Sequence, residues 1–224
     1  MKFCWLSQNN SSNLIVFFAG WSFDETPFKT LKCDGFDVLF VYDYNEISEL
    51  EILKNISEKY EHKILICCSM GVFVAASLRK CFENFDKKFA INGTVTPVDN
   101  EFGIPVKMFE LTLKHASVGL SGKFYKNVYK TEEELEKYSQ NPVKRTIEDR
   151  VSELENLYEF IKSHEVNGEK FYDFAVVSEF DKIIPPKNQI ASHTKFNVPI
   201  KTIECGHSPF FGFSEWREIV ELCR

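Results

Sequence analysis

The sequence lacks the features that mark several large protein classes. It contains no apolar run approaching ~18 residues, so no membrane-spanning helix is expected. The N-terminus, Met1–Gln8, is too short in apolar length for a secretory signal peptide. The seven cysteines form no Cys-x-x-Cys pair and no Cys/His cluster with metal-ligand spacing. We therefore expect reduced thiols, no metal, no cofactor, no membrane partner and a cytoplasmic location.

Basic charge is also scarce. The chain has 27 Lys and Arg against 33 Asp and Glu, a net charge of −6, which argues against nucleic acid as a partner. One stretch departs from this balance, because residues 105–130 hold five lysines and a single acid, Glu110. The five are Lys107, Lys114, Lys123, Lys126 and Lys130. They are candidates for contacts with an acidic partner, or they form an ordinary solvated face.

Apolar runs alternate with helical patterns at both ends of the chain. The runs span 14–18, 36–41, 64–68, 89–92, 171–177 and 200–204, with a further strand at 2–6. The predicted helices span 48–60, where Ser48 and Glu51 make a capping box, and also 70–82, 187–193 and 214–222, with a short helix at 27–32. Continuous apolar strands of this kind suit the interior of a sheet. The alternation predicts an α/β fold with a mostly parallel, doubly wound sheet.

The pattern changes between residues 97 and 168. This segment has almost no β-like alternation and contains helical stretches at 131–140, where Thr131 and Glu134 make a capping box, and at 147–164. We expect residues 1–96 and 169–224 to form the core, and residues 97–168 to form a helical insertion. The insertion is either a lid over the catalytic edge of the sheet, which its length and position favour, or a decoration of the fold.

The run Ile64–Cys68 ends in Ser69-Met-Gly71, and a helical pattern starts at once. This strand, turn and helix resembles the G-x-S-x-G nucleophile elbow of the α/β-hydrolases. Gly71 meets the need for a small residue two positions after the serine, and Cys67 stands where the first glycine would be. A Ser-Met-Gly turn in any other parallel α/β domain is the alternative.

A nucleophilic serine needs a base and an acid, which follow it in the order Ser, Asp or Glu, His in this fold. Here Asp181 and His207 follow Ser69, each just past an apolar strand. We favour Asp181 over Glu179 because the Asp-Lys-Ile-Ile-Pro context holds a short carboxylate in a fixed turn. The oxyanion donors are predicted to be the amides of Met70 and, in the Gly-Trp loop after an early strand, of Trp21.

Four segments together resemble the BioG type of biotin-pathway esterase. They are Phe18-Ala-Gly-Trp-Ser-Phe-Asp24, the Cys-Ser-Met-Gly elbow, Asn92-Gly-Thr-Val-Thr-Pro-Val-Asp-Asn-Glu-Phe-Gly-Ile-Pro105 and the closing Gly-His-Ser-Pro-Phe. The likeness extends over nearly the whole chain and is strongest at the start of the insertion, which hydrolase chemistry does not itself require.

The resemblance implies an α/β-hydrolase with a helical lid that cleaves the methyl ester of pimeloyl-acyl-carrier-protein methyl ester. It assigns the nucleophile, acid and base to Ser69, Asp181 and His207 and the oxyanion donors to Trp21 and Met70. It also gives the five lysines a purpose, since acyl carrier proteins are strongly acidic. A broader short-chain acyl esterase or thioesterase, and an inactive hydrolase-fold protein that only binds a partner, remain as alternatives.

Overall fold

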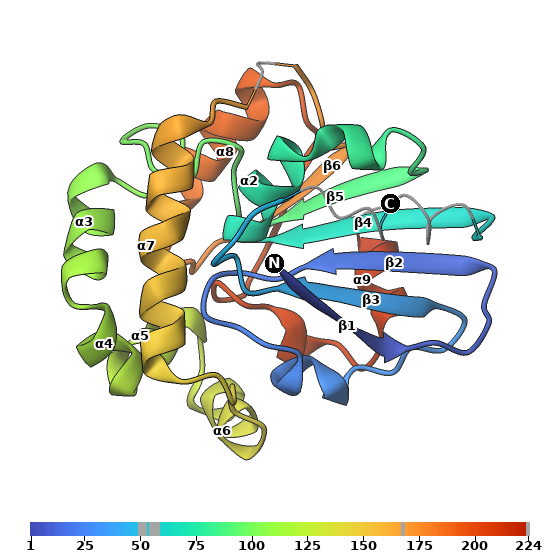
Figure 1. Ribbon diagram of the computed structural model, residues 1–224, viewed down its shortest axis with the longest axis horizontal. Coiled ribbons are helices and arrows are strands. Elements are labelled where there is room, and N and C mark those ends of the chain that lie inside the picture. Colours follow the sequence, from blue (N-terminus) through green and yellow to red (C-terminus); the bar gives the residue numbers. More distant parts are fainter. Residues whose placement is uncertain (49–52, 54–58, 167–168, 223–224) are drawn as a thin grey trace.

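The computed structural model describes residues 1–48, 53, 59–166 and 169–222 of the chain (Figure 1). The predicted helix at 48–60, with its capping box of Ser48 and Glu51, lies largely outside the described residues. Its one described interior residue, Leu53, is helical and buried.

Within the described residues, one sheet contains seven strands in the order β1-β3-β2-β4-β5-β6-β7. The strands are β1 (Lys2–Ser7), β2 (Asn13–Phe18), β3 (Asp37–Tyr42), β4 (His62–Cys68), β5 (Lys87–Ile91), β6 (Phe174–Ser178) and β7 (Ile200–Ile203). Strand β1 pairs antiparallel with β3 at one edge, and all other pairings are parallel. The predicted mostly parallel sheet is confirmed. The carboxyl ends of its parallel strands point toward the same side of the molecule, and β1 points the other way (Figure 1).

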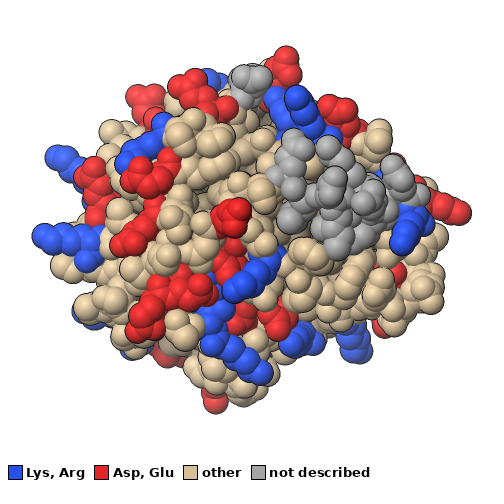
Figure 2. Space-filling view, viewed as in Figure 1, with Lys and Arg blue, Asp and Glu red and all other residues tan. Residues whose placement is uncertain are grey.

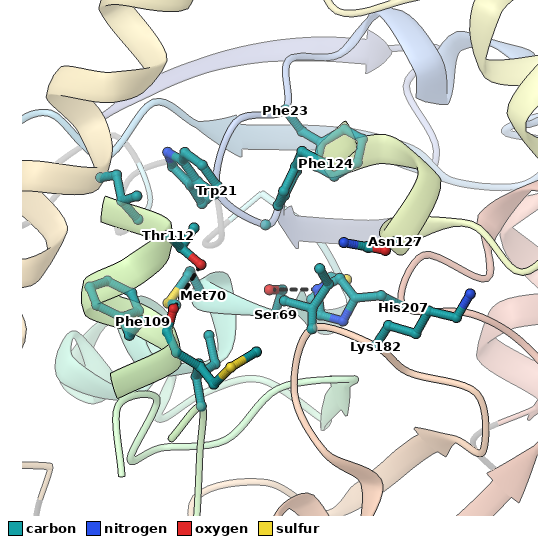
Figure 3. Close-up of a pocket in the computed structure, with 16 residues that line it drawn as sticks. Trp21, Phe23, Ser69, Met70, Phe109, Thr112, Phe124, Asn127, Lys182 and His207 are labelled. Atoms are coloured by element: carbon teal, nitrogen blue, oxygen red, sulfur yellow. Dashed lines mark hydrogen bonds between the residues drawn. The ribbon is translucent and has the colours of Figure 1, made fainter. Parts of the chain in front are cut away.

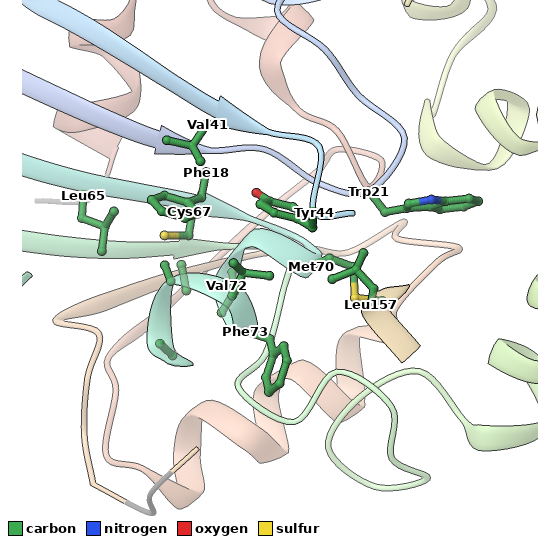
Figure 4. Packing of buried hydrophobic residues seen from close by; sticks show 14 of the residues in the cluster. Phe18, Trp21, Val41, Tyr44, Leu65, Cys67, Met70, Val72, Phe73 and Leu157 are labelled. Atoms are coloured by element: carbon green, nitrogen blue, oxygen red, sulfur yellow. The ribbon is translucent and has the colours of Figure 1, made fainter. Parts of the chain in front are cut away.

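Both faces of the inner strands are buried, which explains their continuous apolar sequences. On β2, Phe18 packs into a cluster on the face covered by helix α2 (Met70–Ser77), where Figure 4 shows it near Cys67. The next residue back, Phe17, faces the opposite side and lies 5.0 Å, centroid to centroid, from Trp216 of α9 (Trp216–Leu222). Because neighbouring strand residues point to opposite faces, helices on both sides demand apolar residues at every position.

Two predicted boundaries were wrong by several residues. Helix α2 ends at Ser77, before the expected residue 82, because the Leu78 amide donates to Ala75 O and the chain continues as a 3₁₀ turn, η2 (Arg79–Phe82). Strand β6 begins at Phe174 and not at 171. The short helix expected at 27–32 is a 3₁₀ turn, η1 (Thr26–Thr30), and helix α8 spans Pro186–Lys195.

Helices fill the segment between β5 and β6. They are α3 (Val106–Lys114), α4 (Ala116–Val118), the π turn η3 (Gly119–Lys123), α5 (Phe124–Val128), α6 (Glu132–Gln140) and α7 (Ile147–Ser163). Figure 1 shows α3, α4, α5 and α7 beside the carboxyl ends of the parallel strands. The capping box predicted at α6 is confirmed, with the Glu134 amide donating to Thr131 Oγ1 and the Glu134 carboxylate accepting from the Thr131 amide.

The described part of the chain has no helix long and apolar enough to cross a bilayer. Among the same residues, no three His, Cys, Asp or Glu side chains are placed to hold a metal ion. Five of the described cysteines are free thiols, namely Cys4, Cys33, Cys67, Cys68 and Cys205.

His193 of α8 should make the stability of the fold pH-dependent. Its Nε2 lies 2.9 Å from Gly93 O, and burial lowers its pKa from 6.5 to about 4. The unfolded chain therefore binds more protons between these values, and the free energy of unfolding should fall by about 3 kcal/mol as the pH drops from about 6.5 to about 4.

Denaturant unfolding across this pH range measures the effect. The variant His193→Gln keeps a donor for Gly93 O but does not titrate, so its unfolding free energy should have a shallower acid slope than the wild type. Equal slopes in the His193→Gln variant and the wild type would contradict the prediction.

Candidate active site

Ser69 occupies a strained turn between β4 and α2. Its φ of 54° lies in the left-handed region, which a serine adopts at a cost. Gly71 is required there, because a Cβ at this position would lie 2.5 Å from the carbonyl oxygens of Phe18 and Ala19. Cys67 is fully buried in the apolar cluster, and burial raises the pKa of its thiol, so it behaves as a small neutral side chain.

Three side chains far apart in sequence form one hydrogen-bond chain. Ser69 Oγ lies 2.9 Å from His207 Nε2, and His207 Nδ1 lies 2.8 Å from Asp181 Oδ2 (Figure 3). All three residues are buried and follow the carboxyl ends of β4, β6 and β7. With the imidazole proton on Nδ1, His207 donates to Asp181 and accepts from Ser69, which is the arrangement a general base needs.

The Asp181 carboxylate is held by four donors. Oδ1 accepts the amides of Ile183 and Ile184 at 2.8 and 2.9 Å, and Oδ2 accepts from Gln189 Nε2 and from His207, both at 2.8 Å. Of the two acids that the sequence offered, Asp181 contacts His207, whereas Glu179 is exposed. The Ile-Ile segment of the predicted turn therefore holds the carboxylate through its backbone.

Asn92 joins the loops that carry the acid and the base, a role that sequence reasoning missed. Its Nδ2 donates to His207 O and to Ser178 Oγ, each at 2.8 Å, and its Oδ1 accepts the Ser178 amide at 2.7 Å. Asn92 has a φ of 48°, which asparagine tolerates better than most residues. The signal in the sequence was an Asn-Gly pair directly after an apolar strand.

Two residues beside Ser69 have backbone amides without a hydrogen-bond partner among the described residues. Trp21 and Met70 both line the cavity above the serine, and neither amide donates a hydrogen bond to another described residue. Gly20 brings the first loop close, since a Cβ there would lie 3.0 Å from Ser69 Cβ. Two unpaired N–H groups flanking a nucleophile can stabilise an oxyanion, and Met70 also begins helix α2.

A cavity of about 130 Å³ opens beside Ser69 and His207. Its walls are largely apolar, and Figure 3 shows Trp21, Phe23 and Phe124 on one side and Phe109 on another. The insertion supplies Ile104, Met108, Phe109, Thr112, Phe124, Asn127 and Leu154. The cavity can therefore hold an acyl chain whose reactive end lies at Ser69.

The five lysines of residues 105–130 differ in their surroundings. Lys107, Lys114, Lys123 and Lys126 are exposed and form no ion pair with any described residue. Figure 2 shows Lys and Arg side chains projecting at the side of the molecule where α3 and α4 lie. Lys130 is different, because its Nζ donates to Glu204 O at 3.0 Å and lies 4.0 Å from the centre of the Phe180 ring.

A serine at a strained strand-to-helix turn, bonded to a histidine that an aspartate orients, identifies the class of this protein as an α/β-hydrolase. The family can be named as well. The model of a family described as "Pimeloyl-ACP methyl esterase BioG" matches residues 1–219, and this chain belongs to that family of carboxylic ester hydrolases.

Relatives agree with this placement. The crystal structure of BioG from Haemophilus influenzae superposes with a TM-score of 0.86 at 28% identity, covering 97% of this chain and 99% of that one. An esterase from Exiguobacterium antarcticum shares the fold, with a TM-score of 0.63 at 14% identity over 95% of this chain and 90% of its own. A malonyl-[acyl-carrier protein] O-methyltransferase of Bacteroides fragilis is 29% identical over 86% of this chain, which spans 39% of the length of that relative.

Proposed function

We propose that this protein hydrolyses the methyl ester of pimeloyl-[acyl-carrier protein] methyl ester, giving pimeloyl-[acyl-carrier protein] and methanol for biotin biosynthesis. The hydrogen-bond chain from Ser69 through His207 to Asp181, at the wall of an apolar cavity, carries the proposal. Membership of the BioG family supports this choice of substrate.

The reaction has two halves. His207 Nε2 takes the Ser69 proton as Oγ attacks the ester carbonyl, and the amides of Trp21 and Met70 donate to the oxyanion. The tetrahedral intermediate collapses, methanol leaves with the proton from His207, and the acyl group stays on Ser69 as an ester. Water, deprotonated by His207, then attacks this ester and releases the free carboxylate.

The insertion serves as a lid in this proposal. Residues 1–96 and 169–224 form the α/β-hydrolase core, and residues 97–168 form the lid, whose Phe109 and Phe124 supply apolar cavity walls. The exposed Lys123 directly precedes Phe124, and the exposed Lys126 follows it two residues later. An acidic acyl carrier protein docked on these lysines would present its acyl arm next to the cavity.

The direct test follows the mass of the carrier protein. Incubation of the purified protein with pimeloyl-acyl-carrier-protein methyl ester should remove the mass of one methylene group. A thioesterase would instead release the unacylated carrier protein. An unchanged carrier-protein mass, from enzyme that still reacts with a fluorophosphonate, would retain a serine hydrolase but reject this substrate.

Charge reversal of Lys123 and Lys126 should weaken binding of the carrier-protein substrate without affecting small esters. In the double variant Lys123→Glu/Lys126→Glu, we expect the KM for pimeloyl-acyl-carrier-protein methyl ester to rise roughly five- to tenfold at low salt, because attraction to the acidic partner becomes repulsion. The kcat/KM for a small ester such as p-nitrophenyl butyrate should not change.

A matched control reverses two exposed lysines elsewhere. Lys80 and Lys87 lie after α2 and at the start of β5, away from the strand ends that carry Ser69. Lys80→Glu/Lys87→Glu alters the net charge equally and should leave KM unchanged. Equal KM values for both double variants would mean that the lysines of the lid do not dock the carrier protein.

A further inference from the structure

The buried carboxylate of Glu153, in the insertion, accepts a hydrogen bond from the loop that contains Trp21, the proposed second oxyanion donor. Glu153 lies on α7 with no exposed surface. Its Oε2 accepts the Ser22 amide at 3.2 Å, and its Oε1 accepts the Tyr44 amide at 3.0 Å. Ser22 directly follows Trp21 and has a φ of 74°, a conformation that needs such support.

Residues of the insertion make two more hydrogen bonds to the same loop. Trp21 Nε1 donates to Arg150 O of α7 at 2.7 Å, and Ser22 Oγ lies 2.9 Å from the Tyr125 hydroxyl of α5. Arg150 donates in turn to that hydroxyl at 3.0 Å. Residues more than a hundred positions away in the chain therefore bind the Trp21 side chain and the amide and hydroxyl groups of Ser22.

Glu153 is also fixed from its other side. Arg145 is nearly buried and donates to Glu153 Oε2 at 2.8 Å, and it also pairs with Asp43 at 3.2 Å and with Asp149 at 2.7 Å. Asp43 follows strand β3 of the core. The pairs form one largely buried network that ties α7 to the carboxyl end of β3, so Glu153 has little freedom to move.

We infer that Glu153 is a positioning residue that holds the oxyanion loop, residues 19–22, with the Trp21 amide directed at the reacting carbonyl. The side chain of Glu153 does not line the cavity. Helix α7 is then a fixed part of the catalytic framework, and any opening of the lid is confined to α3, α4 and α5. The inference rests on the proposed roles of Ser69 and Trp21 but not on the identity of the acyl partner.

The variant Glu153→Gln tests the inference. The Ser22 and Tyr44 amides donate to different oxygens of Glu153, so a glutamine in the same position accepts only one of them and turns its NH₂ group toward the other. We expect kcat for p-nitrophenyl butyrate to fall about 10- to 100-fold with KM unchanged, because a displaced oxyanion donor affects the transition state and not the bound ester. Burial raises the pKa of Glu153 to about 7, with Arg145 opposing this, so the assay is run at pH ~8, where most of the carboxylate is ionised.

A second readout separates positioning from general loss of structure. A trifluoromethyl ketone forms an oxyanion on Ser69. Its inhibition constant should rise by about the same factor as kcat falls. The exposed Glu155 on the same helix provides the control, since Glu155→Gln should match the wild type. A kcat within twofold of the wild type, or a fall in kcat without weaker ketone binding, would overturn the inference.

If Glu153→Gln does not fold, Tyr125→Phe provides the test, since it removes one hydrogen bond to Ser22 while Arg150, which loses the same hydroxyl as an acceptor, still donates from Nε to Thr146 O at 3.1 Å. We expect a kcat about fivefold lower with unchanged KM, and equal kcat would overturn the inference. A wild-type protein that neither hydrolyses the ester nor reacts with a fluorophosphonate would instead refute the proposed serine chemistry.

Discussion

Ser69→Ala should abolish hydrolysis of both pimeloyl-acyl-carrier-protein methyl ester and small esters. We expect kcat to fall roughly 10⁵- to 10⁶-fold, because in the proposed mechanism Ser69, His207 and Asp181 act as a unit and no acyl-enzyme forms without the serine oxygen. What remains should come only from binding and the oxyanion donors. The Ser69 hydroxyl lies at the end of the hydrogen-bond chain and at the cavity wall, so its loss removes the nucleophile and no packing.

The measurement combines initial rates with covalent labelling. A fluorophosphonate should add to the wild-type protein once and should not add to Ser69→Ala. Ser77, at the far end of the same helix, donates to Phe73 O and offers the control, since Ser77→Ala should keep its activity and its label. More than about 1% residual activity in Ser69→Ala would show that another group performs the chemistry.

Asp181→Asn should lower kcat by about 10⁴-fold while the protein stays folded. Oδ1 must still accept the amides of Ile183 and Ile184, so the new side-chain nitrogen takes the place of Oδ2. That nitrogen donates to His207 Nδ1, which moves the imidazole proton to Nε2. His207 then donates to Ser69 and cannot accept its proton.

Kinetics and unfolding measurements together test this change. The control is Glu179→Gln, since Glu179 is the other acid in the same loop and is exposed. We expect Glu179→Gln to match the wild type in kcat and KM. A loss in Glu179→Gln comparable to that in Asp181→Asn would reassign the acid.

Most of the sheet was predictable from local pattern. The strands of the core are buried on both faces, so they stand out as continuous apolar runs, and helical patterns between them imply parallel connections. Element ends were less predictable. The end of α2 depends on where the chain near Leu78 leaves helical geometry, which the sequence from Met70 to Phe82 does not reveal.

The candidates for nucleophile and base could also be recognised from the sequence. Gly71 follows Ser69 by two positions, and the backbone of Phe18 and Ala19 leaves no room for a larger residue there. This requirement for a small residue is visible in the local sequence. His207 follows the last strand and is preceded by Gly206. A glycine is needed at 206 because of a contact with a distant part of the chain. A Cβ on Gly206 would lie 2.7 Å from the Lys130 amide nitrogen.

By itself, the sequence determined the mostly parallel α/β architecture and pointed to Ser69, Asp181 and His207, because small residues and strand ends mark such a site locally. Only the tertiary structure decided that Asp181, and not Glu179, contacts His207. It also decided that Glu153 grips the Ser22 amide across 131 residues. A buried acid on a helix has the same local pattern as any other acid, and its partners become visible only when the chain has folded.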